Sequence, residues 1–245
     1  MYDLCVIGAG CIGSAAAWYG SKYGRVCLIG PPEPKVRDPT SPRDVFGAHY
    51  DEGRITRKSD SDYVMSTLAR ESIARYRDVE KQSGIPFYNE VGYIICGAQG
   101  SDYMLNNRKR ADEFQIKAKY LVNNDLTRHF PFLNFSKLDV ALYEERSSGY
   151  ISPRRLTEAH RSLAKQNGCD AVDEIATVVK RLVLEGRYVM CVTTDCGKQI
   201  YAKKVLLTTG AFTPFRCLLP GELKVDVELF PITVALVEIS EEDYG

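Results

Sequence analysis

The sequence predicts an α/β protein built around a parallel β-sheet, and two observations support this prediction. Residues 2–7 form a short β-prone run, a glycine turn and a helix of small residues follow at 8–13 and 14–22, and residues 25–29 form a second apolar run. Strand, helix and strand in this order are typical of the βαβ unit, whose two strands are parallel. Near residues 177–202, three more β-prone runs separated by short turns predict an antiparallel meander.

Length and composition describe an ordinary globular chain. The 245 residues are enough for one large domain or two small ones, and 44% hydrophobic with 26% charged residues excludes a disordered or collagen-like polymer. Lys plus Arg number 32 and Asp plus Glu number 32, so no net charge favours nucleic acid or an anionic membrane. We therefore expect small molecules or proteins as partners.

Three absences in the sequence predict the location of the protein. No apolar stretch reaches the roughly 18 residues of a membrane span. The sequence starts with a strand-like run at Tyr2 and lacks the charged and apolar regions of a signal peptide. The eight cysteines include no Cys-x-x-Cys pair. We expect free thiols in the cytoplasm or another reducing compartment, and no metal site. His129 and His160 have no partner at metal or triad spacing, so we expect structural roles for both.

The middle of the chain alternates between helix and strand. Residues 62–83 carry apolar side chains along one helical face, and Gly84 suits the end of that helix. A strand at 92–96, a helix at 101–114 capped by Ser101 and a strand at 139–143 follow. Ser152 and Pro153 suit the N-cap and first position of a helix that runs to residue 166.

The last part of the chain is predicted to be mostly β-structure. The meander comprises 177–184, 188–194 and 199–202, and we expect a further buried strand at 204–207 and one more at 230–239. By contrast, residues 30–57 are rich in Pro, Asp and Arg and show little periodicity. Connections of that length are usually functional or disordered, and we favour a functional loop.

A glycine-rich motif carries the first chemical signal. Gly8-Ala9-Gly10-Cys11-Ile12-Gly13 follows a strand and opens a helix, which is the context of the dinucleotide-binding fingerprint. The glycines allow a tight turn, a close approach of backbone to pyrophosphate and close packing of helix on strand, while the helix N-terminus faces the phosphates. A glycine turn used only for packing is the alternative.

The second half of the fingerprint is altered. An acidic residue should end the second strand and bind the ribose hydroxyls, but that place holds Gly30. Glu33 could replace it, or could be a solvated turn residue among its neighbouring prolines. Lys35 and Arg37 would suit a ribose 2′-phosphate and hence a phosphorylated nicotinamide cofactor. These residues leave flavin and nicotinamide both open.

Longer motifs favour flavin. Three further segments accompany the fingerprint: Phe46-Gly47-Ala48-His49-Tyr50-Asp51-Glu52-Gly53-Arg54-Ile55-Thr56-Arg57, Ser148-Gly149-Tyr150-Ile151-Ser152-Pro153 and Leu206-Leu207-Thr208-Thr209-Gly210-Ala211-Phe212. Together they resemble the sarcosine oxidase and pipecolate oxidase group of flavin-dependent amine oxidases, within the wider D-amino-acid-oxidase-like family. The resemblance covers nearly the whole chain, and Arg-Ile-x-Arg is its most specific motif.

The resemblance implies an interleaved architecture. A Rossmann-type FAD-binding domain with an antiparallel β-meander would comprise residues 1–82 and 151–215. An α+β substrate domain would comprise 83–150 and begin a second stretch at 216–245. Complete relatives continue further, so the resemblance also implies a chain that is incomplete at its C-terminus and lacks the cysteine that some members link to flavin. We therefore expect non-covalent FAD.

The resemblance also assigns roles to individual residues. Arg54 would lie against the flavin ring as the catalytic arginine, and Arg57 would bind the substrate carboxylate, for which a guanidinium fork is well suited. On spacing alone, two solvated arginines beside Asp51 and Glu52 are the alternative. The implied cofactor-binding residues are Gly8, Ala9, Gly10, Ile12, Gly13, Glu33, Tyr50, Gly53, Arg54, Ile55, Val178, Thr209 and Gly210.

Two of these positions, Tyr50 and Val178, match the group less directly than the others. Tyr50 stands where the group often has histidine, and Val178 resembles the residue whose backbone meets adenine, although it could be plain strand core. The implied reaction oxidises the C–N bond of a small secondary or N-methyl amino acid to an imine, with oxygen as acceptor. A nicotinamide-dependent reductase that uses Lys35 or Arg37, and a non-catalytic remnant of a flavin oxidase, are the alternatives.

Overall fold

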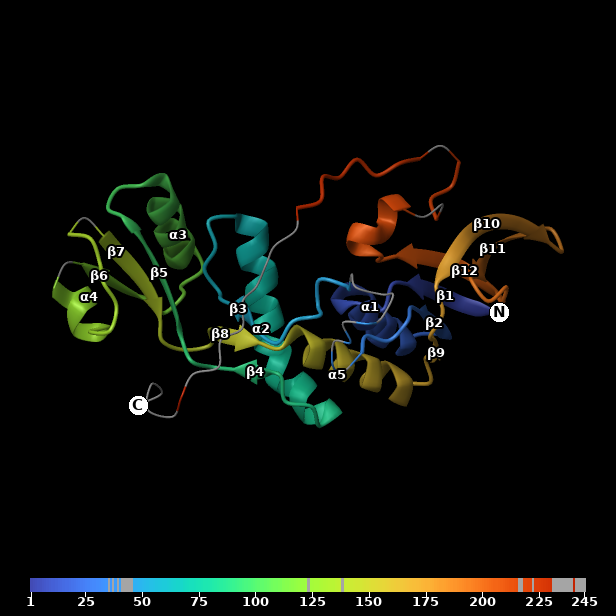
Figure 1. The fold of residues 1–245 in the computed structure, drawn as a ribbon, viewed down its shortest axis with the longest axis horizontal. Coiled ribbons are helices and arrows are strands. Elements are labelled where there is room, and N and C mark those ends of the chain that lie inside the picture. Colours follow the sequence, from blue (N-terminus) through green and yellow to red (C-terminus); the bar gives the residue numbers. More distant parts are fainter. Residues whose placement is uncertain are drawn as a thin grey trace.

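The computed structural model describes residues 1–34, 36, 38, 40, 46–122, 124–137, 139–215, 218–221, 223–230 and 240. Its elements in chain order are β1 (Tyr2–Ile7), α1 (Cys11–Ser21), β2 (Val26–Ile29), β3 (Arg54–Thr56), α2 (Tyr63–Ser83), β4 (Tyr88–Asn89), β5 (Tyr93–Ala98), α3 (Asp102–Glu113), β6 (Lys119–Val122), α4 (Asn124–His129), β7 (Asp139–Glu144), β8 (Gly149–Ile151), α5 (Pro153–Gln166), β9 (Asp170–Val172), β10 (Ala176–Leu184), β11 (Arg187–Thr194), β12 (Gln199–Leu207) and the 3₁₀ helix η1 (Gly210–Phe215) (Figure 1). They form two sheets at opposite ends of an elongated molecule, with a small third sheet between them.

The main sheet confirms the predicted βαβ unit and meander. Its strand order is β10-β11-β12-β1-β2-β9, and β1 runs parallel to both β2 and β12. The strands β10, β11 and β12 are antiparallel to one another. The α/β fold class with a parallel sheet and an attached antiparallel meander is therefore confirmed.

The prediction of two separate strands at 199–202 and 204–207 is wrong. β12 is continuous: its first half pairs with β11, and from Ala202 onward it pairs in parallel with β1. The second half is not buried either, since Lys204 and Leu206 are exposed. The paired lysines at 203 and 204 interrupt the apolar pattern, but backbone hydrogen bonds to two different neighbours carry the strand through them. The strand predicted at 230–239 lies outside the described residues except for Phe230.

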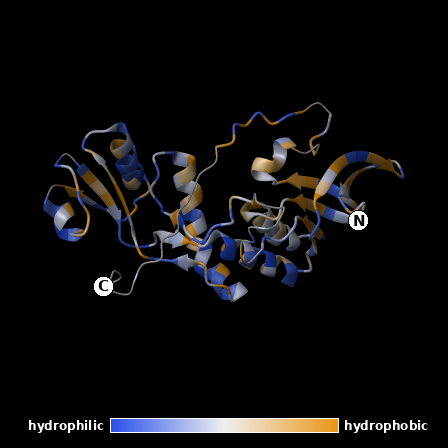
Figure 2. Cartoon of the chain, viewed as in Figure 1, coloured by the Kyte–Doolittle hydropathy of each residue, from blue (hydrophilic) through white to orange (hydrophobic). Residues whose placement is uncertain are grey.

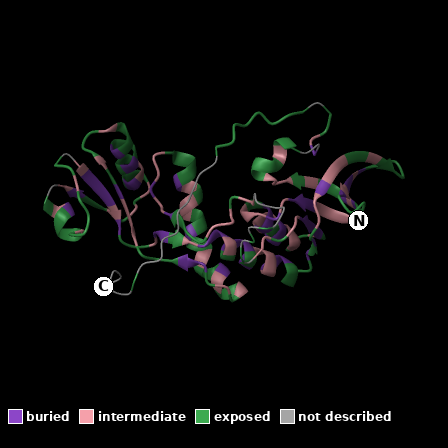
Figure 3. Ribbon diagram, in the orientation of Figure 1, coloured by how far each residue is buried: buried purple, intermediate pink, exposed green. Residues whose placement is uncertain are grey.

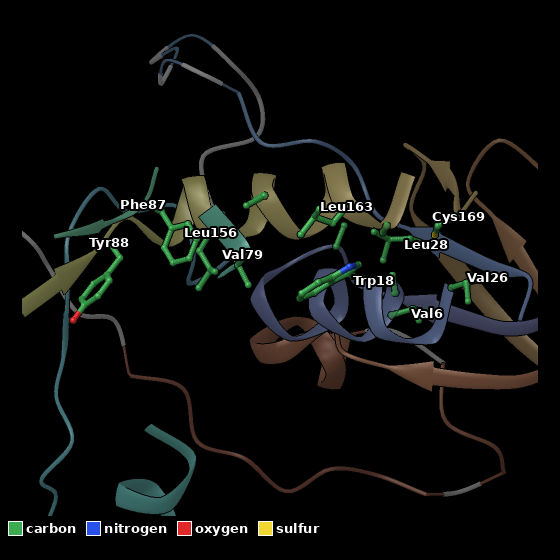
Figure 4. Close-up of a cluster of buried hydrophobic side chains, with 14 of the residues drawn as sticks. Val6, Trp18, Val26, Leu28, Val79, Phe87, Tyr88, Leu156, Leu163 and Cys169 are labelled. Carbon is green, nitrogen blue, oxygen red and sulfur yellow. The ribbon is translucent and has the colours of Figure 1, made fainter. Parts of the chain in front are cut away.

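One face of the main sheet is covered by α1 and α5, which pack against each other. Trp18 of α1 lies between the two helices, near Leu163 of α5 and Val6 of β1, and Leu156 of α5 packs farther along, beside Phe87 (Figure 4). Helix α1 begins at Cys11, three residues before the prediction, because Gly10 serves as N-cap without a capping side chain. The core on this face is therefore built by two helices that lie far apart in the sequence.

The sheet at the other end is antiparallel, in the order β5-β7-β6, and α3 packs on it. The predicted caps Ser101 of α3 and Ser152 of α5 are confirmed, as is Gly84 at the end of α2. Asp62, which the sequence analysis did not identify as a cap, accepts a hydrogen bond from the N–H of Met65 at the start of α2. Between the two ends, β3, β8 and β4 form a short three-stranded sheet. The sequence did not predict β3, β4, β6, β8, β9 or α4, all of six residues or fewer.

Apolar residues concentrate in the strands of both large sheets and in the faces between α1 and α5 (Figure 2). Helix α3 and the extended stretch at 223–230 are largely exposed (Figure 3). No helix among the described residues is both long enough and apolar enough for a membrane span.

His160 of α5 is part of the core between the helices. Its ring stacks on Trp18 with ring centroids 5.4 Å apart, and burial lowers the pKa of His160 to about 4. The pKa in the unfolded chain is the higher of the two, so the unfolded chain takes up the proton first as the pH falls. The stability contributed by neutral His160 is therefore fully present above about pH 6.5 and is lost as the pH falls toward about 4.

We expect His160→Gln to flatten the pH dependence of stability. Between pH 7 and pH 4.5 the free energy of unfolding, measured with urea, should fall by up to about 3 kcal/mol less in this variant than in the parent. His129→Gln, on the exposed helix α4, is the control and should follow the parent. If the free energy of unfolding depends on pH equally in the parent and in His160→Gln, the lowered pKa assigned to His160 is contradicted.

Candidate functional site

The glycine turn between β1 and α1 brings three stretches of backbone into contact. Gly8 has a φ of +108°, a conformation that residues with side chains rarely adopt. A Cβ atom on Gly8 would lie 2.4 Å from the carbonyl oxygen of Thr208, and one on Gly13 would lie 1.7 Å from the carbonyl oxygen of Gly8. Neither position has room for a side chain. The turn therefore has the close packing of helix on strand that the fingerprint predicts.

Thr208, which the sequence analysis did not single out, holds this turn in place. Its backbone N–H donates to the carbonyl oxygen of Ile7 at 2.8 Å, and its hydroxyl lies 2.9 Å from the carbonyl oxygens of both Ile7 and Gly8. These bonds join the end of β12 to the end of β1. A small hydroxyl residue after an apolar run was the only signal in the sequence, and it is too common to be specific.

The first turn of α1 is suited to an anion. Gly10 is the N-cap and provides no side-chain cap, and no acidic residue lies in this turn. The free N–H groups and the positive end of the helix dipole therefore favour a negatively charged group here. Ala9 is buried beneath the turn, whereas Ile12 exposes its apolar side chain. The turn thus presents backbone donors beside one apolar surface.

The end of β2 explains why the chain has Gly30 where an acidic residue is expected. A Cβ atom on Gly30 would lie 2.7 Å from the backbone nitrogen of Ala9, so a side chain there would displace the glycine turn. Glu33, the predicted substitute, accepts a hydrogen bond from the N–H of Gly47 at 3.2 Å. Its side chain is only 14% exposed, so the alternative of a solvated turn residue is wrong.

His49 is a second residue that the sequence analysis missed. A Cβ atom on Gly10 would lie 3.3 Å from Nδ1 of His49, so the ring lies against the fingerprint glycine. Nε2 of His49 lies 4.0 Å from Glu33, and both residues line a cavity of about 530 Å³ beside α5. The long predicted loop is therefore folded back onto the glycine turn.

Arg154, at the start of α5, holds the next part of that loop. Its guanidinium pairs with Glu52 at 2.7 Å, donates to the carbonyl oxygen of Pro34 at 3.0 Å and lies 4.4 Å from the ring centroid of Tyr50. Tyr50 also stacks on Phe46, with centroids 4.4 Å apart. The ring of Tyr50 is thus held between two neighbours. Arg154 could not be identified from sequence because 102 residues separate it from Glu52.

Strand β3 carries Arg54 close to the first turn of α1. Nε of Arg54 pairs with Asp51 at 2.6 Å. Arg54 is the register partner of Ile151 in β8, and α5, which follows β8, contacts the first turn of α1 through Thr157, whose Oγ1 lies 3.3 Å from Sγ of Cys11. The neighbours of Arg54 are open: a Cβ atom on Gly53 would meet nothing within 4 Å, and Ile55 is exposed. This part of β3 is free to contact a flat ligand.

Arg57 lies just beyond β3 and keeps a donor free. Its Nη2 donates to Asp60 at 2.6 Å, and its guanidinium carbon lies 5.4 Å from the ring centroid of Tyr93. Its Nε is buried and has no hydrogen-bond partner in the described part of the chain. Burial raises the pKa of Tyr93 to about 12, against the opposing charge of Arg57. The guanidinium is therefore only partly satisfied.

The alternative of two solvated arginines beside Asp51 and Glu52 holds for Arg54, which is exposed and pairs with Asp51, but is wrong for Arg57. Asp51 pairs with Arg54, whereas Glu52 pairs with Arg154. Arg57 pairs instead with Asp60, and its side chain is half-buried. Each of the two arginines therefore pairs with a carboxylate three residues away, which precedes Arg54 and follows Arg57. This pairing positions each guanidinium and lowers the net charge around it.

The remaining predicted residues lie on the meander and at the end of β12. Val178 is half-buried in β10 and pairs with Thr193, beside a register shift that begins at Ala176. Thr209 and Gly210 directly follow Thr208, and Gly210, with φ +52°, has open space around its Cα. Thr209 and Gly210 are therefore close to the glycine turn, whereas the contact of Val178 with adenine stays a prediction.

Two further predictions concern groups away from this site. Lys35 and Arg37, the residues of the nicotinamide alternative, lie outside the described residues. Among the described residues, one group of possible metal ligands lies within 4.8 Å of one another, namely Glu174, Asp195 and Cys196, and two of these three are exposed. Exposed acidic groups commonly gather without an ion, so the absence of a metal site stays a prediction.

Comparison with known proteins decides the family. Residues 3–243 match the family model of the DAO group, described as FAD-dependent oxidoreductase. The chain belongs to the DAO family of FAD-dependent oxidoreductases. It is 31% identical to the monomeric sarcosine oxidase of Streptomyces avermitilis over 172 residues, which are 69% of this chain and 42% of that enzyme. It is 25% identical to the N-methyl-L-tryptophan oxidase of Yersinia pestis (strain Pestoides F) over 228 residues, which are 88% of this chain and 58% of that enzyme.

Solved structures share the fold. NikD, an unusual amino acid oxidase, aligns in its open form with a TM-score of 0.65 and 22% identity, over 86% of this chain and 52% of NikD. Glycine oxidase from Geobacillus kaustophilus aligns with a TM-score of 0.65 and 16% identity, over 86% of this chain and 56% of that chain. The DAO-family chain spans about half the length of the relatives it matches.

The residues present fit the cofactor of the DAO family. The glycine turn excludes side chains and leaves backbone exposed, which a bound pyrophosphate requires. The first turn of α1 lacks a side-chain cap, and the nearby Arg54 supplies positive charge. The apolar side chains of Ile12 and Ile55 are exposed around this turn and strand, as expected where a large aromatic ring system binds.

We expect Gly13→Ala to destabilise the protein by more than about 2 kcal/mol, because its new methyl group must displace the backbone of Gly8. Gly53→Ala is the matched control, since its methyl group meets open space, and its free energy of unfolding should stay within about 0.5 kcal/mol of the parent. Urea unfolding measures both. Equal stability of the two variants would contradict the steric argument.

Proposed function

We propose that this chain carries the FAD site of an oxidase that acts on the C–N bond of a small secondary or N-methyl amino acid, with oxygen as electron acceptor and FAD bound non-covalently. One observation carries the proposal. β3 pairs Arg54 with β8, whose following helix α5 contacts the first turn of α1, and Arg57, just after β3, lies beside Tyr93 with an Nε that has no hydrogen-bond partner among the described residues. The names of the curated relatives point the same way, because sarcosine is N-methylglycine.

In this proposal two interleaved domains meet at the site. Residues 1–82 and 151–215 form the FAD-binding domain, which contains the main sheet, and residues 83–150 and 216–245 belong to the substrate domain. The small sheet of β3, β8 and β4 joins the two, since β3 pairs with β8 from Arg54↔Ile151 to Thr56↔Gly149. A ligand beside β3 would therefore touch both domains.

The FAD-binding residues follow from the open surfaces of the site. Backbone N–H groups at the start of α1 bind the pyrophosphate, and Glu33 faces the ribose from the end of β2. Gly53 and Ile55 lie along one edge of the flavin ring, and Tyr50 supports that segment from its place between Phe46 and Arg154. Ala9, Thr209 and Gly210 would lie beneath the cofactor, and Val178 would contact the adenine.

Arg54 and Arg57 have different roles, one toward the flavin ring and one toward the substrate. FAD, when bound, supplies the redox chemistry by accepting the electrons of the C–N bond. Arg54 places a positive charge beside the flavin ring, and Asp51 holds its guanidinium in that orientation. Arg57, whose guanidinium is only partly satisfied within the chain, would bind the substrate carboxylate through its accessible atoms and so fix the position of the reacting carbon.

Asp60 lowers the affinity of Arg57 for a substrate carboxylate. Its carboxylate already occupies Nη2 of Arg57, so a substrate carboxylate meets a guanidinium that is partly neutralised. The two carboxylates then share one cation, and their mutual repulsion limits how tightly the substrate is held. Moderate binding of this kind suits a site that must also release its product.

We expect the purified chain to bind FAD reversibly. After incubation with FAD and gel filtration, the protein should show flavin absorbance bands, and acid precipitation should release all of the flavin into the supernatant because no covalent bond holds it. Flavin that stays in the pellet contradicts the non-covalent assignment. A chain with no flavin bands at any FAD concentration contradicts the FAD site and favours a non-catalytic remnant.

Arg57→Ala should weaken binding of acetate to the FAD-loaded chain by at least about tenfold, because a charge-assisted hydrogen bond to a carboxylate is lost. Binding of acetamide, which has the same shape without the charge, should change by less than about twofold. Titration followed by flavin absorbance measures both. Equal losses for the two ligands would remove the carboxylate-binding role.

Two variants complete this test. Asp60→Asn should strengthen acetate binding by about two- to fivefold, since it removes the competing carboxylate. Arg128→Ala removes an Arg–Asp pair of the same i,i+3 spacing from the exposed helix α4 and should leave acetate affinity unchanged. Loss of affinity in both arginine variants would indicate a non-specific effect of charge.

A further inference from the structure

Glu144, the last residue of β7, is a fully buried carboxylate that the proposed function does not use. Its exposed fraction is 0%. Oε1 accepts hydrogen bonds from the N–H of Ser59 at 2.8 Å and from the hydroxyl of Ser59, and Oε2 accepts from the N–H of Lys58 at 3.1 Å and from the hydroxyl of Ser148. A buried carboxylate is costly unless donors surround it, and here each oxygen has two.

Two of these donors belong to the backbone directly after Arg57. The N–H of Lys58 shares its planar peptide unit with the carbonyl group of Arg57, so fixing that N–H also fixes the Cα atom from which the arginine side chain starts. The carbonyl oxygen of Lys58 accepts from the hydroxyl of Ser66 at 2.6 Å. The short turn after Arg57 is therefore held from both sides by buried groups.

The strand pair β5–β7, to which Glu144 belongs, also contacts the side chain of Arg57. Glu144 of β7 is the direct register partner of Tyr93 in β5, and directly opposed residues of an antiparallel pair lie on one face of the sheet. The ring of Tyr93 lies 5.4 Å from the guanidinium carbon of Arg57. One pair of neighbouring residues thus contacts both the peptide and the guanidinium of Arg57.

We propose that Glu144 is a positioning residue: it fixes the backbone after Arg57 and so sets the affinity of the site for a carboxylate without touching the ligand. This inference rests on the proposed role of Arg57. Glu144 also links the β5-β7-β6 sheet to β8 through the hydroxyl of Ser148, so it ties the position of Arg57 to the junction of the two proposed domains.

A double-mutant cycle with acetate tests the proposal. Glu144→Gln keeps the size of the side chain but replaces one acceptor oxygen by a donor group, so donors at Lys58 or Ser59 lose their partner. We expect it to raise the Kd for acetate about tenfold when Arg57 is present and by less than about twofold in the Arg57→Ala background. A residue with only a general structural role would weaken acetate binding equally in both backgrounds.

A second readout needs no ligand and no cofactor. Amide hydrogen exchange at Lys58 and Ser59, followed by NMR, should be at least about tenfold faster in Glu144→Gln, because both N–H groups are released. Asn107→Ala is the matched control for general loss of stability: it removes another buried polar side chain, on α3 beside the same sheet, that does not contact this turn. It should leave both exchange rates and the acetate Kd unchanged.

The outcomes separate the two proposals. If acetate binding of the parent does not depend on Arg57, the proposed function fails and the role of Glu144 fails with it. If acetate binding depends on Arg57 but Glu144→Gln leaves the Kd unchanged, the role of Glu144 is overturned and the proposed function stands. Unchanged exchange at Lys58 and Ser59 also overturns it, as does an effect of Asn107→Ala equal to that of Glu144→Gln.

Discussion

The site depends on the absence of side chains at Gly8 and Gly13. With a carbonyl oxygen 1.7 Å from the place where a Cβ of Gly13 would be, the start of α1 can approach the end of β1 only as bare backbone. Thr208 closes the same contact from β12 through three hydrogen bonds. The end of the parallel sheet, the first turn of the helix and the loop toward η1 thus meet at one point, and His49 and Gly30 lie against it.

The second requirement is to hold Arg54 on a very short strand and Arg57 just after it. β3 has three residues, too few to be stable alone, so its position comes from contacts that are distant in sequence. β8 pairs with it, Arg154 holds the loop before it, and Glu144 holds the turn after it. Each of these contacts spans more than 80 residues. The chemistry of the site is therefore local in sequence, while its geometry is set by long-range contacts.

Local signals in the sequence determined the larger elements. The helices α3 and α5 begin at the predicted capping residues because a side-chain oxygen and the N–H groups it binds are only a few residues apart, and α2 ends at the predicted glycine. The strands of the meander were recognisable for a similar reason, since turn residues separate them. The short strands β4, β6 and β9 were not, because two to four residues carry no pattern and only pairing with a neighbour makes them strands.

The sequence by itself determined the family, and with it the cofactor class, because the glycine fingerprint and the Arg-Ile-x-Arg segment together resemble that family; it also singled out the two arginines whose roles are proposed. Only the tertiary structure decided how those residues are held. It showed that Gly30 leaves no room for a carboxylate and that Glu33 lies against Gly47. It also showed that Arg57 pairs with Asp60, lies beside Tyr93 and precedes a turn whose N–H groups donate to Glu144. The physical reason is that a buried polar group needs partners in space, and the chain can supply these partners from any distance along the sequence.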